Sequence, residues 1–162
     1  MKRFAWGCGL TEMRRTMLER TSARVITGGR IVGSQGAVPG ILEEAWLSID
    51  NGKPLYVVGG FGGMAGTIGD LLEGRSVPEF TDEFAQKNVP NYRQVLELYS
   101  KQGIPFVSAS QMMKDIKTAG AKGIAAALNN GLNDEQNQEL FGIVDPVLTA
   151  ELIVSGIRSF GK

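Results

Sequence analysis

The feature that most constrains this chain is a pair of short apolar segments, each of which ends in two glycines. Arg24 to Thr27 is followed by Gly28-Gly29, and Pro54 to Val58 is followed by Gly59-Gly60. The unbroken apolar run from Pro54 to Val58 is typical of a parallel strand covered on both faces, and Arg24 to Thr27 is predicted to be a short buried strand. A glycine pair lets a ligand approach the backbone closely. The pattern therefore predicts two parallel strands with ligand-binding loops at their carboxyl ends.

A helical pattern follows each of these strands. The first helix is predicted to open at Pro39 or Gly40, to run to about Ile49 and to stop at Asn51-Gly52. The second helix is predicted over residues 64–72, after Gly59-Gly60-Phe61-Gly62-Gly63. A helix that begins with Pro-Gly leaves its first backbone amides free to bind an anion.

The rest of the chain is predicted to be mostly helical. A helix capped by Thr11 should carry the basic pair Arg14 and Arg15. Ile104 to Val107 is a candidate third strand. Further helices are expected at 81–83, 92–102, 108–117, 124–128, after Asn133 and from Asp145-Pro146 onward.

The composition excludes several kinds of catalytic and metal site. The 162 residues, 43% of them hydrophobic and 21% charged, fit one globular domain over residues 1–162. The absence of histidine excludes a Ser-His-Asp triad and a HExxH metal site. The lone Cys8 excludes an internal disulfide and a multi-thiolate zinc site. The acidic residues are scattered, so neither a metal site nor a cofactor is expected.

Charge and hydropathy limit the kinds of partner that the chain is expected to bind. Lys+Arg and Asp+Glu are both 17, so the bulk charge does not favour nucleic-acid binding. A local basic group, Arg14, Arg15, Arg20, Arg24 and Arg30, suits one phosphate-bearing ligand. No run reaches about 18 apolar residues, so no membrane span is expected. The single cysteine and the lack of a signal-peptide pattern favour the cytoplasm.

The expected fold class is α/β, a Rossmann-like parallel sheet flanked by helices, with a helical C-terminal part. Two strands and one candidate third strand are too few for the number of predicted helices. Three alternatives remain open: another strand near Phe4 to Cys8, a chain that is the C-terminal part of a larger fold, or a sheet completed by a partner chain. We therefore expect a homo-oligomer or part of a larger assembly.

The order of these motifs resembles that of a known superfamily. Met-Arg-Arg-x-Met at 13–17, Gly-Gly at 28–29 and Pro-Gly-x-x-Glu-Glu at 39–44 are similar to the Lonely Guy (LOG) phosphoribohydrolases. Their signature is an Arg-Lys-x-x-Met helix followed by Pro-Gly-Gly-x-Gly-Thr-x-x-Glu. The chain is closer still to SLOG-superfamily domains related to the amino-terminal region of TRPM channels and to bacterial nucleotide-sensing systems. Those domains combine Gly-Gly-Arg, Pro-Gly-Ile-x-Glu-Glu and Gly-Gly-Phe-Gly-Gly, as this chain does at 28–30, 39–44 and 59–63.

The resemblance implies a nucleotide site. Arg14 matches the arginine of the LOG Arg-Lys pair, and Glu44 matches the last glutamate of the LOG signature. In an enzyme these two would be catalytic, with the arginine on the phosphate and the carboxylate on the ribose or on positive charge developing on the sugar. Ile41 stands where LOG enzymes have threonine. The expected ligand-binding residues are Arg14, Gly28, Gly29, Arg30, Gly40, Ile41, Glu44, Gly60, Phe61, Gly62 and Gly63.

Three functions stay open at this point. The first is a domain that binds a nucleotide or an ADP-ribose-like signal as a sensor or regulator. The second is a LOG-like N-glycoside hydrolase that releases the base from a nucleoside 5′-monophosphate. The third is a structural α/β module that oligomerises.

Overall fold

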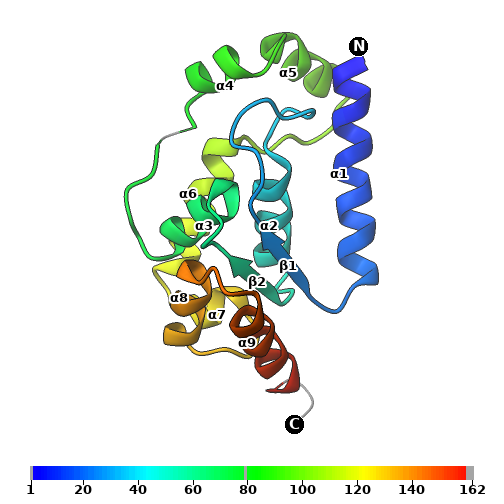
Figure 1. Cartoon of the computed structure of the whole chain (residues 1–162). Coiled ribbons are helices and arrows are strands. Elements are labelled where there is room, and N and C mark those ends of the chain that lie inside the picture. The colour runs from blue at the N-terminus through cyan, green and yellow to red at the C-terminus, as the bar shows by residue number, and fades with distance from the viewer. Residues whose placement is uncertain (1, 79, 160–162) are drawn as a thin grey trace.

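The structure of the protein is a computed structural model that describes residues 2–78 and 80–159. Within these ranges it contains one small parallel sheet and a majority of helices (Figure 1). The elements are α1 (Lys2–Arg20), β1 (Arg24–Thr27), α2 (Gly40–Asp50), β2 (Leu55–Val58), α3 (Gly63–Leu72), α4 (Asp82–Asn88), α5 (Tyr92–Lys101), α6 (Ala109–Gly120), α7 (Ile124–Leu128), α8 (Asp134–Gly142) and α9 (Pro146–Ser159).

The two strands pair in parallel, as predicted. Arg24 lies opposite Leu55 and Thr27 lies opposite Val58, and α2 is the helix between the two strands in the chain. The sheet has two strands in the described part of the chain. The α/β class and the Rossmann-like, incomplete sheet are therefore confirmed.

The two faces of the sheet are covered to different extents. Ile26 and Val57 point into the main core, which α2, α3 and α6 complete. On the opposite face Tyr56 and Val58 are buried in a second core with side chains of α8 and α9. Val25, which is paired with Tyr56, is 50% exposed. The β1 half of this face is therefore uncovered.

A buried amide network ties the C-terminal part to β2. The Tyr56 hydroxyl donates to the Asn130 carbonyl oxygen over 2.7 Å. Asn130 Nδ2 donates to the Leu55 carbonyl oxygen and to Asn137 Oδ1, each over 2.8 Å. Asn130 and Asn137 are fully buried, so these bonds supply the partners that buried amides require. They fix α8 against the strand.

Two predictions about the amino-terminal part are wrong. The first helix begins at Lys2 rather than at a Thr11 cap, so Thr11 lies in the middle of α1. Phe4 to Cys8 belongs to the same helix, which removes this segment as a hidden strand. The physical reason is that Phe4 packs edge-on against Tyr99 of α5, with ring centroids 5.0 Å apart. This contact gives the aromatic side chain a partly buried place on a helix.

The candidate third strand at Ile104 to Val107 is also wrong, because this segment has no strand pairing among the described residues. Pro105 lacks the amide that a sheet ladder needs. Phe106 instead packs against Tyr99, with ring centroids 5.1 Å apart. The segment serves as a wall between α5 and α6.

Candidate functional site

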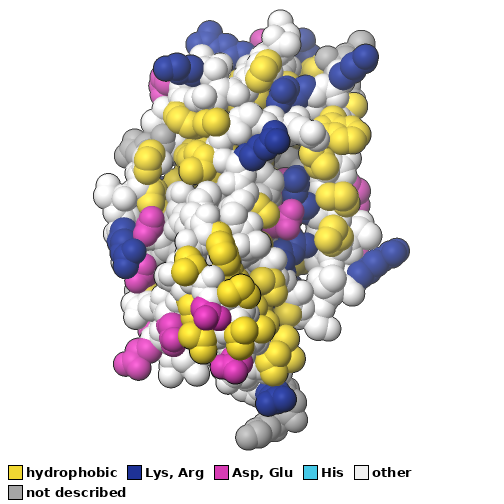
Figure 2. Space-filling model, viewed as in Figure 1, with side chains coloured by type: hydrophobic (Ala, Val, Ile, Leu, Met, Phe, Trp, Pro, Cys, Tyr) yellow, Lys and Arg dark blue, Asp and Glu magenta, His cyan; other side chains and the backbone are white. Residues whose placement is uncertain are grey.

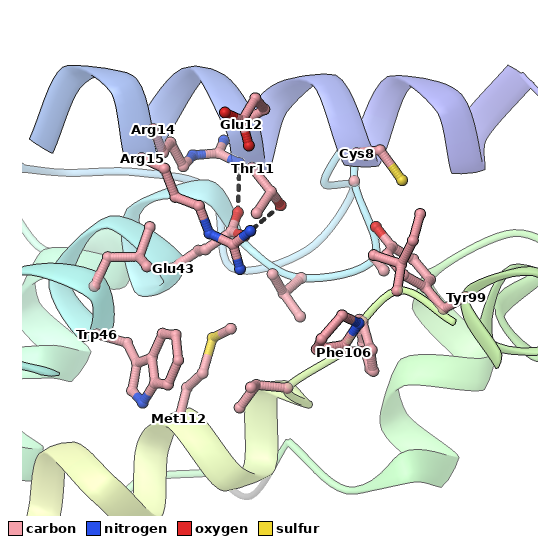
Figure 3. Close-up of a pocket in the computed structure, with 18 residues that line it drawn as sticks. Cys8, Thr11, Glu12, Arg14, Arg15, Glu43, Trp46, Tyr99, Phe106 and Met112 are labelled. Atoms are coloured by element: carbon pink, nitrogen blue, oxygen red, sulfur yellow. Dashed lines mark hydrogen bonds and ion pairs between the residues drawn. The ribbon is translucent and has the colours of Figure 1, made fainter. Parts of the chain in front are cut away.

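A buried charge cluster lies where α1, β1 and α2 meet. Arg14 of α1 and Glu43 of α2 are only 8% and 5% exposed. Arg14 Nη1 lies 2.5 Å from Glu43 Oε2, and the Thr11 hydroxyl donates to Glu43 Oε1 over 2.5 Å. Figure 3 shows these contacts crossing from α1 to α2. A buried pair of this kind holds the two helices in one geometry, because either charge alone would be costly to bury.

Glu44 occupies the other side of the cluster in looser contacts. Its carboxylate lies 3.4 Å from Arg14 Nε and 3.5 Å from Arg24 Nη1. The contact with Arg24 is an ion pair without hydrogen-bond geometry, because Arg24 Nη1 is buried and has no hydrogen-bond partner among the described residues. Two arginines and two glutamates balance each other in charge. Glu44 and Arg24 nevertheless keep unused hydrogen-bonding capacity.

The first turn of α2 is open to a ligand. Pro39, at the N-cap, supplies no side-chain hydrogen bond. The backbone amides of Gly40, Ile41 and Leu42 have no hydrogen-bond partner within the described ranges. A Cβ at Gly40 would lie 2.5 Å from Arg14 Nη2, so glycine lets the guanidinium lie against the helix start. Free amides and the helix dipole favour an anion at this point.

A cavity of about 350 Å³ opens over this helix start. Its charged lining residues are Arg14, Arg30 and Glu44, so two positive charges and one negative charge leave the lining at +1. The volume falls within the range of roughly 300–1,000 Å³ that is usual for small-molecule sites. The structure thus brings together five predicted residues. They are Arg14, Arg30, Gly40, Ile41 and Glu44.

The predicted glycine pair Gly28-Gly29 lies against α3. The carbonyl oxygens of Gly28 and Gly29 accept hydrogen bonds from the amides of Ala65 and Met64, over 2.8 and 3.1 Å. Both glycines have positive φ, which other residues adopt at a cost. The pair therefore satisfies the N-terminal amides of α3 and does not line the cavity over α2.

The loop Gly59 to Gly63 is packed closely against other backbone. A Cβ at Gly60 would overlap the carbonyl oxygen of Ile143, and one at Gly63 would lie 2.5 Å from that of Gly29. Phe61 is 56% exposed. None of Gly60 to Gly63 lines the cavity over α2. Their role in ligand contact stays a prediction.

A second cavity, of about 270 Å³, lies on the far side of the Arg14–Glu43 pair (Figure 3). Trp46, Tyr99 and Phe106 give it an aromatic lining. Burial raises the pKa of the Tyr99 phenol, and the neighbouring Cys8 and Glu43 side chains raise it further. Arg14 therefore lines both cavities, whereas Glu43 lines only the second.

Sequence reasoning placed Arg24 in a local basic group, but it did not name Arg24, Thr11 or Glu43 among the ligand-binding residues. Arg24 is the first residue of β1 and Arg14 lies in α1, so no periodicity within a single element relates them. Only the packing of α1 across β1 and α2 brings these residues together. The two consecutive acids at the start of α2 were the one available signal, since they offer a carboxylate to each side of Arg14.

No group of three or more Asp, Glu, Cys or His residues in the described ranges could hold a metal ion. Across those same residues, no helix has the length and apolar character needed to cross a membrane.

Comparison with known families agrees with the geometry. A family model described as SLOG cluster2 matches residues 1–140, which include the whole charge cluster and the start of α2. No curated protein and no solved structure matches the chain. Residues 141–162 lie beyond the family match. The resemblance found in the motifs is confirmed, and the chain belongs to the SLOG cluster2 family.

Proposed function

We propose that this domain binds a nucleotide or a nucleotide-derived molecule of the ADP-ribose type, as a sensor or regulatory domain. Family membership supports a nucleotide-related domain at a coarse level. The observation that carries the proposal is the set of three amides at Gly40, Ile41 and Leu42, unpartnered within the described ranges, at a helix start whose first two residues, Gly40 and Ile41, line a cavity with a net charge of +1. An anionic small molecule supplies the hydrogen-bond acceptors and the negative charge that this arrangement lacks.

The phosphate belongs at the start of α2. Arg30 is exposed and lines the cavity, so its guanidinium is available for a two-pronged contact with phosphate. Arg14 is held by Glu43 and lies against Gly40, so it contributes positive charge from a fixed position. In this proposal Arg30 and the amides bind the phosphate, and Arg14 strengthens the local field.

The sugar belongs beside Glu44. Its carboxylate lines the cavity and makes only long contacts with Arg14 and Arg24, so it can accept hydrogen bonds from ribose hydroxyls. Arg24 Nη1, buried without a hydrogen bond among the described residues, lies on the same side of the cluster. A ligand oxygen or a bound water is the natural partner for that nitrogen.

Phe61 is the side chain of the glycine-rich loop that is available to stack on a base. It is 56% exposed and follows the carboxyl end of β2. Gly28, Gly29, Gly60, Gly62 and Gly63 then shape the loops that lead to the site. On this proposal the domain works in the cytoplasm, within an oligomer or a larger assembly.

A second candidate function is hydrolysis of the N-glycosidic bond of a nucleoside 5′-monophosphate. The position of Glu44 in the cavity favours it, because a carboxylate beside the sugar can stabilise positive charge that develops during bond cleavage. Arg14 would then help to hold the phosphate. Binding and hydrolysis use the same residues. The fate of the bound ligand, intact or cleaved, therefore distinguishes the two functions.

The test is a ligand panel of AMP, NAD, ADP-ribose and cyclic ADP-ribose, with thermal shift and base release recorded together. A ligand at about 100 times its dissociation constant should stabilise the fold by about 2.7 kcal/mol. Stabilisation with intact ligand supports a sensor. Base release that is lost in Glu44→Gln supports a hydrolase. No stabilisation by any phosphate-bearing member would contradict both.

A further inference from the structure

The C-terminal helix α9 carries an apolar stripe that the rest of the described chain leaves open. Its side chains are Val147, Ala150, Val154 and Ile157, spaced three, four and three residues apart. Val147, Val154 and Ile157 are 66%, 42% and 51% exposed. This spacing is the seam pattern of a two-helix coiled coil, in which apolar residues repeat every 3.5 positions.

The stripe is separate from the face that holds α9 to the domain. Leu152 and Ile153 pack into the second core, and Gly156 is the buried residue of α9. A Cβ at Gly156 would meet the Tyr56 ring and the Asn130 carbonyl oxygen at 2.6–2.8 Å. The helix is thus anchored on one side. Figure 2 shows hydrophobic side chains gathered at the lower front, where α9 lies in Figure 1.

Two opposite charges border the stripe and identify its partner. Glu151 and Arg158 are exposed and seven positions apart along the same side of the helix, with no ion pair among the described residues. They lie about 10 Å apart along the axis at 1.5 Å per residue, too far to pair with each other. If a second copy packs antiparallel, Glu151 faces Arg158 of the partner subunit, and the twofold axis repeats the contact. A parallel pair would bring neither charge to an opposite one.

We propose that two copies of this chain associate through α9 in an antiparallel helix pair. Val154 and Ile157 form the central apolar layers, and the two Glu151–Arg158 contacts set the direction and register. The interface lies outside residues 1–140, which the family model matches. The proposal does not depend on the nucleotide site. A contact between two such helices is smaller than a standard interface of roughly 800 Å² per partner, so we expect a dimer that dissociates on dilution.

The experiment is sedimentation or light-scattering mass measured across a dilution series of the intact chain. The mass should rise from that of the 17.4 kDa monomer toward twice that value as concentration increases. Val154→Glu should leave only monomer. Leu148→Glu is the matched control, because Leu148 is 46% exposed on the same helix but lies off the stripe.

Charge reversal tests the orientation. Glu151→Arg or Arg158→Glu alone should weaken dimerisation by roughly tenfold, because each creates two like-charge contacts per dimer. The double variant should recover the wild-type dissociation constant. Circular dichroism checks that each variant keeps its helix content. A monomer at every concentration, equal effects of Leu148→Glu and Val154→Glu, or a double variant as weak as the singles would overturn the proposal.

Discussion

The starts of α2 and α3 show how one sequence pattern can serve two different purposes. Each helix follows a parallel strand and a glycine-rich loop. At α3 the amides of Met64 and Ala65 bind the carbonyl oxygens of Gly29 and Gly28, so the protein itself occupies the helix start. At α2 the amides of Gly40 to Leu42 have no such partner among the described residues, and Gly40 and Ile41 line a cavity. The α3 start completes the fold, and we propose that the α2 start is left for a ligand.

The difference shows that the neighbours of a glycine determine its structural role. Gly63 has a positive φ and backbone packed against it, so it allows a close approach of two protein segments. Gly40 allows the approach of a charged side chain, Arg14, to a helix start. Both residues are glycine because a Cβ would not fit, yet only the second lines a charged cavity.

The largest effect is expected from breaking the ion pair behind the α2 start. Arg14→Ala leaves Glu43 buried without its cation and should lower the free energy of unfolding by about 3–5 kcal/mol. Chemical denaturation measures this loss. The control is Arg75→Ala, whose side chain is 62% exposed and pairs with Asp70 and Glu73, and it should cost at most about 1 kcal/mol. Equal costs for the two variants would mean that the buried pair does not support the α2 start.

A comparison of glycine substitutions at the two ends of α3 distinguishes the cost of a steric clash from the cost of backbone strain. Gly63 and Gly74 have φ of 66° and 75°, but only at Gly63 would an added Cβ meet neighbouring backbone. Gly74→Ala should cost about 1 kcal/mol of stability, from the left-handed backbone alone. Gly63→Ala should cost about 3 kcal/mol, because it adds a clash with Gly29. Thermal and denaturant unfolding measure both, and similar losses would show that the backbone at the α3 start can move aside.

Ligand affinity should respond at the α2 start without a loss of stability. Arg30→Glu reverses a charge that lines the cavity and is exposed, so we expect at least about a tenfold weaker affinity for ADP-ribose or AMP. Unfolding should be unchanged within about 0.5 kcal/mol. Arg20→Glu, an exposed arginine of α1 outside the cavity, is the matched control for net charge. Calorimetric titration gives the affinities, and equal effects of the two variants would place the phosphate elsewhere.

The smallest effect is expected from the glycine-rich loop before α3. Phe61→Ala removes one exposed stacking surface, so affinity should fall by no more than about tenfold. The loss should be smaller than that in Arg30→Glu. A larger loss in Phe61→Ala would move the centre of the site from the start of α2 to the start of α3.

Much of the fold could be predicted because its signals are local. The apolar runs of β1 and β2, the Pro-Gly start of α2 and the Asn51-Gly52 stop each act within a few residues. The start of α1 could not be predicted in this way. Thr11 has the chemistry of a helix cap, but its hydroxyl instead donates a hydrogen bond to Glu43 across the interface between α1 and α2. Tertiary contact overrides a local preference there.

The site was predictable only in part, for the same reason. The motif order predicted that Arg14, Gly40 and Glu44 lie together, and all three line the cavity over α2. The difference between the Gly28-Gly29 pair and Gly40 depends on which amides meet which carbonyl oxygens, and no sequence period encodes that. Arg24 joins the cluster only because β1 passes behind Arg14. There Arg24 Nη2 donates a long hydrogen bond to the carbonyl oxygen of Arg14.

The most direct measurement is a nitrogen-15 NMR titration of the intact chain with ADP-ribose, and with AMP in parallel. We predict that the amide signals of Gly40, Ile41 and Leu42 shift as ligand is added. The amides of Met64 and Ala65, already bonded within the protein, should change far less. Large shifts at Met64 and Ala65 with none at Gly40 to Leu42 would contradict the claim that the start of α2 is the anion site.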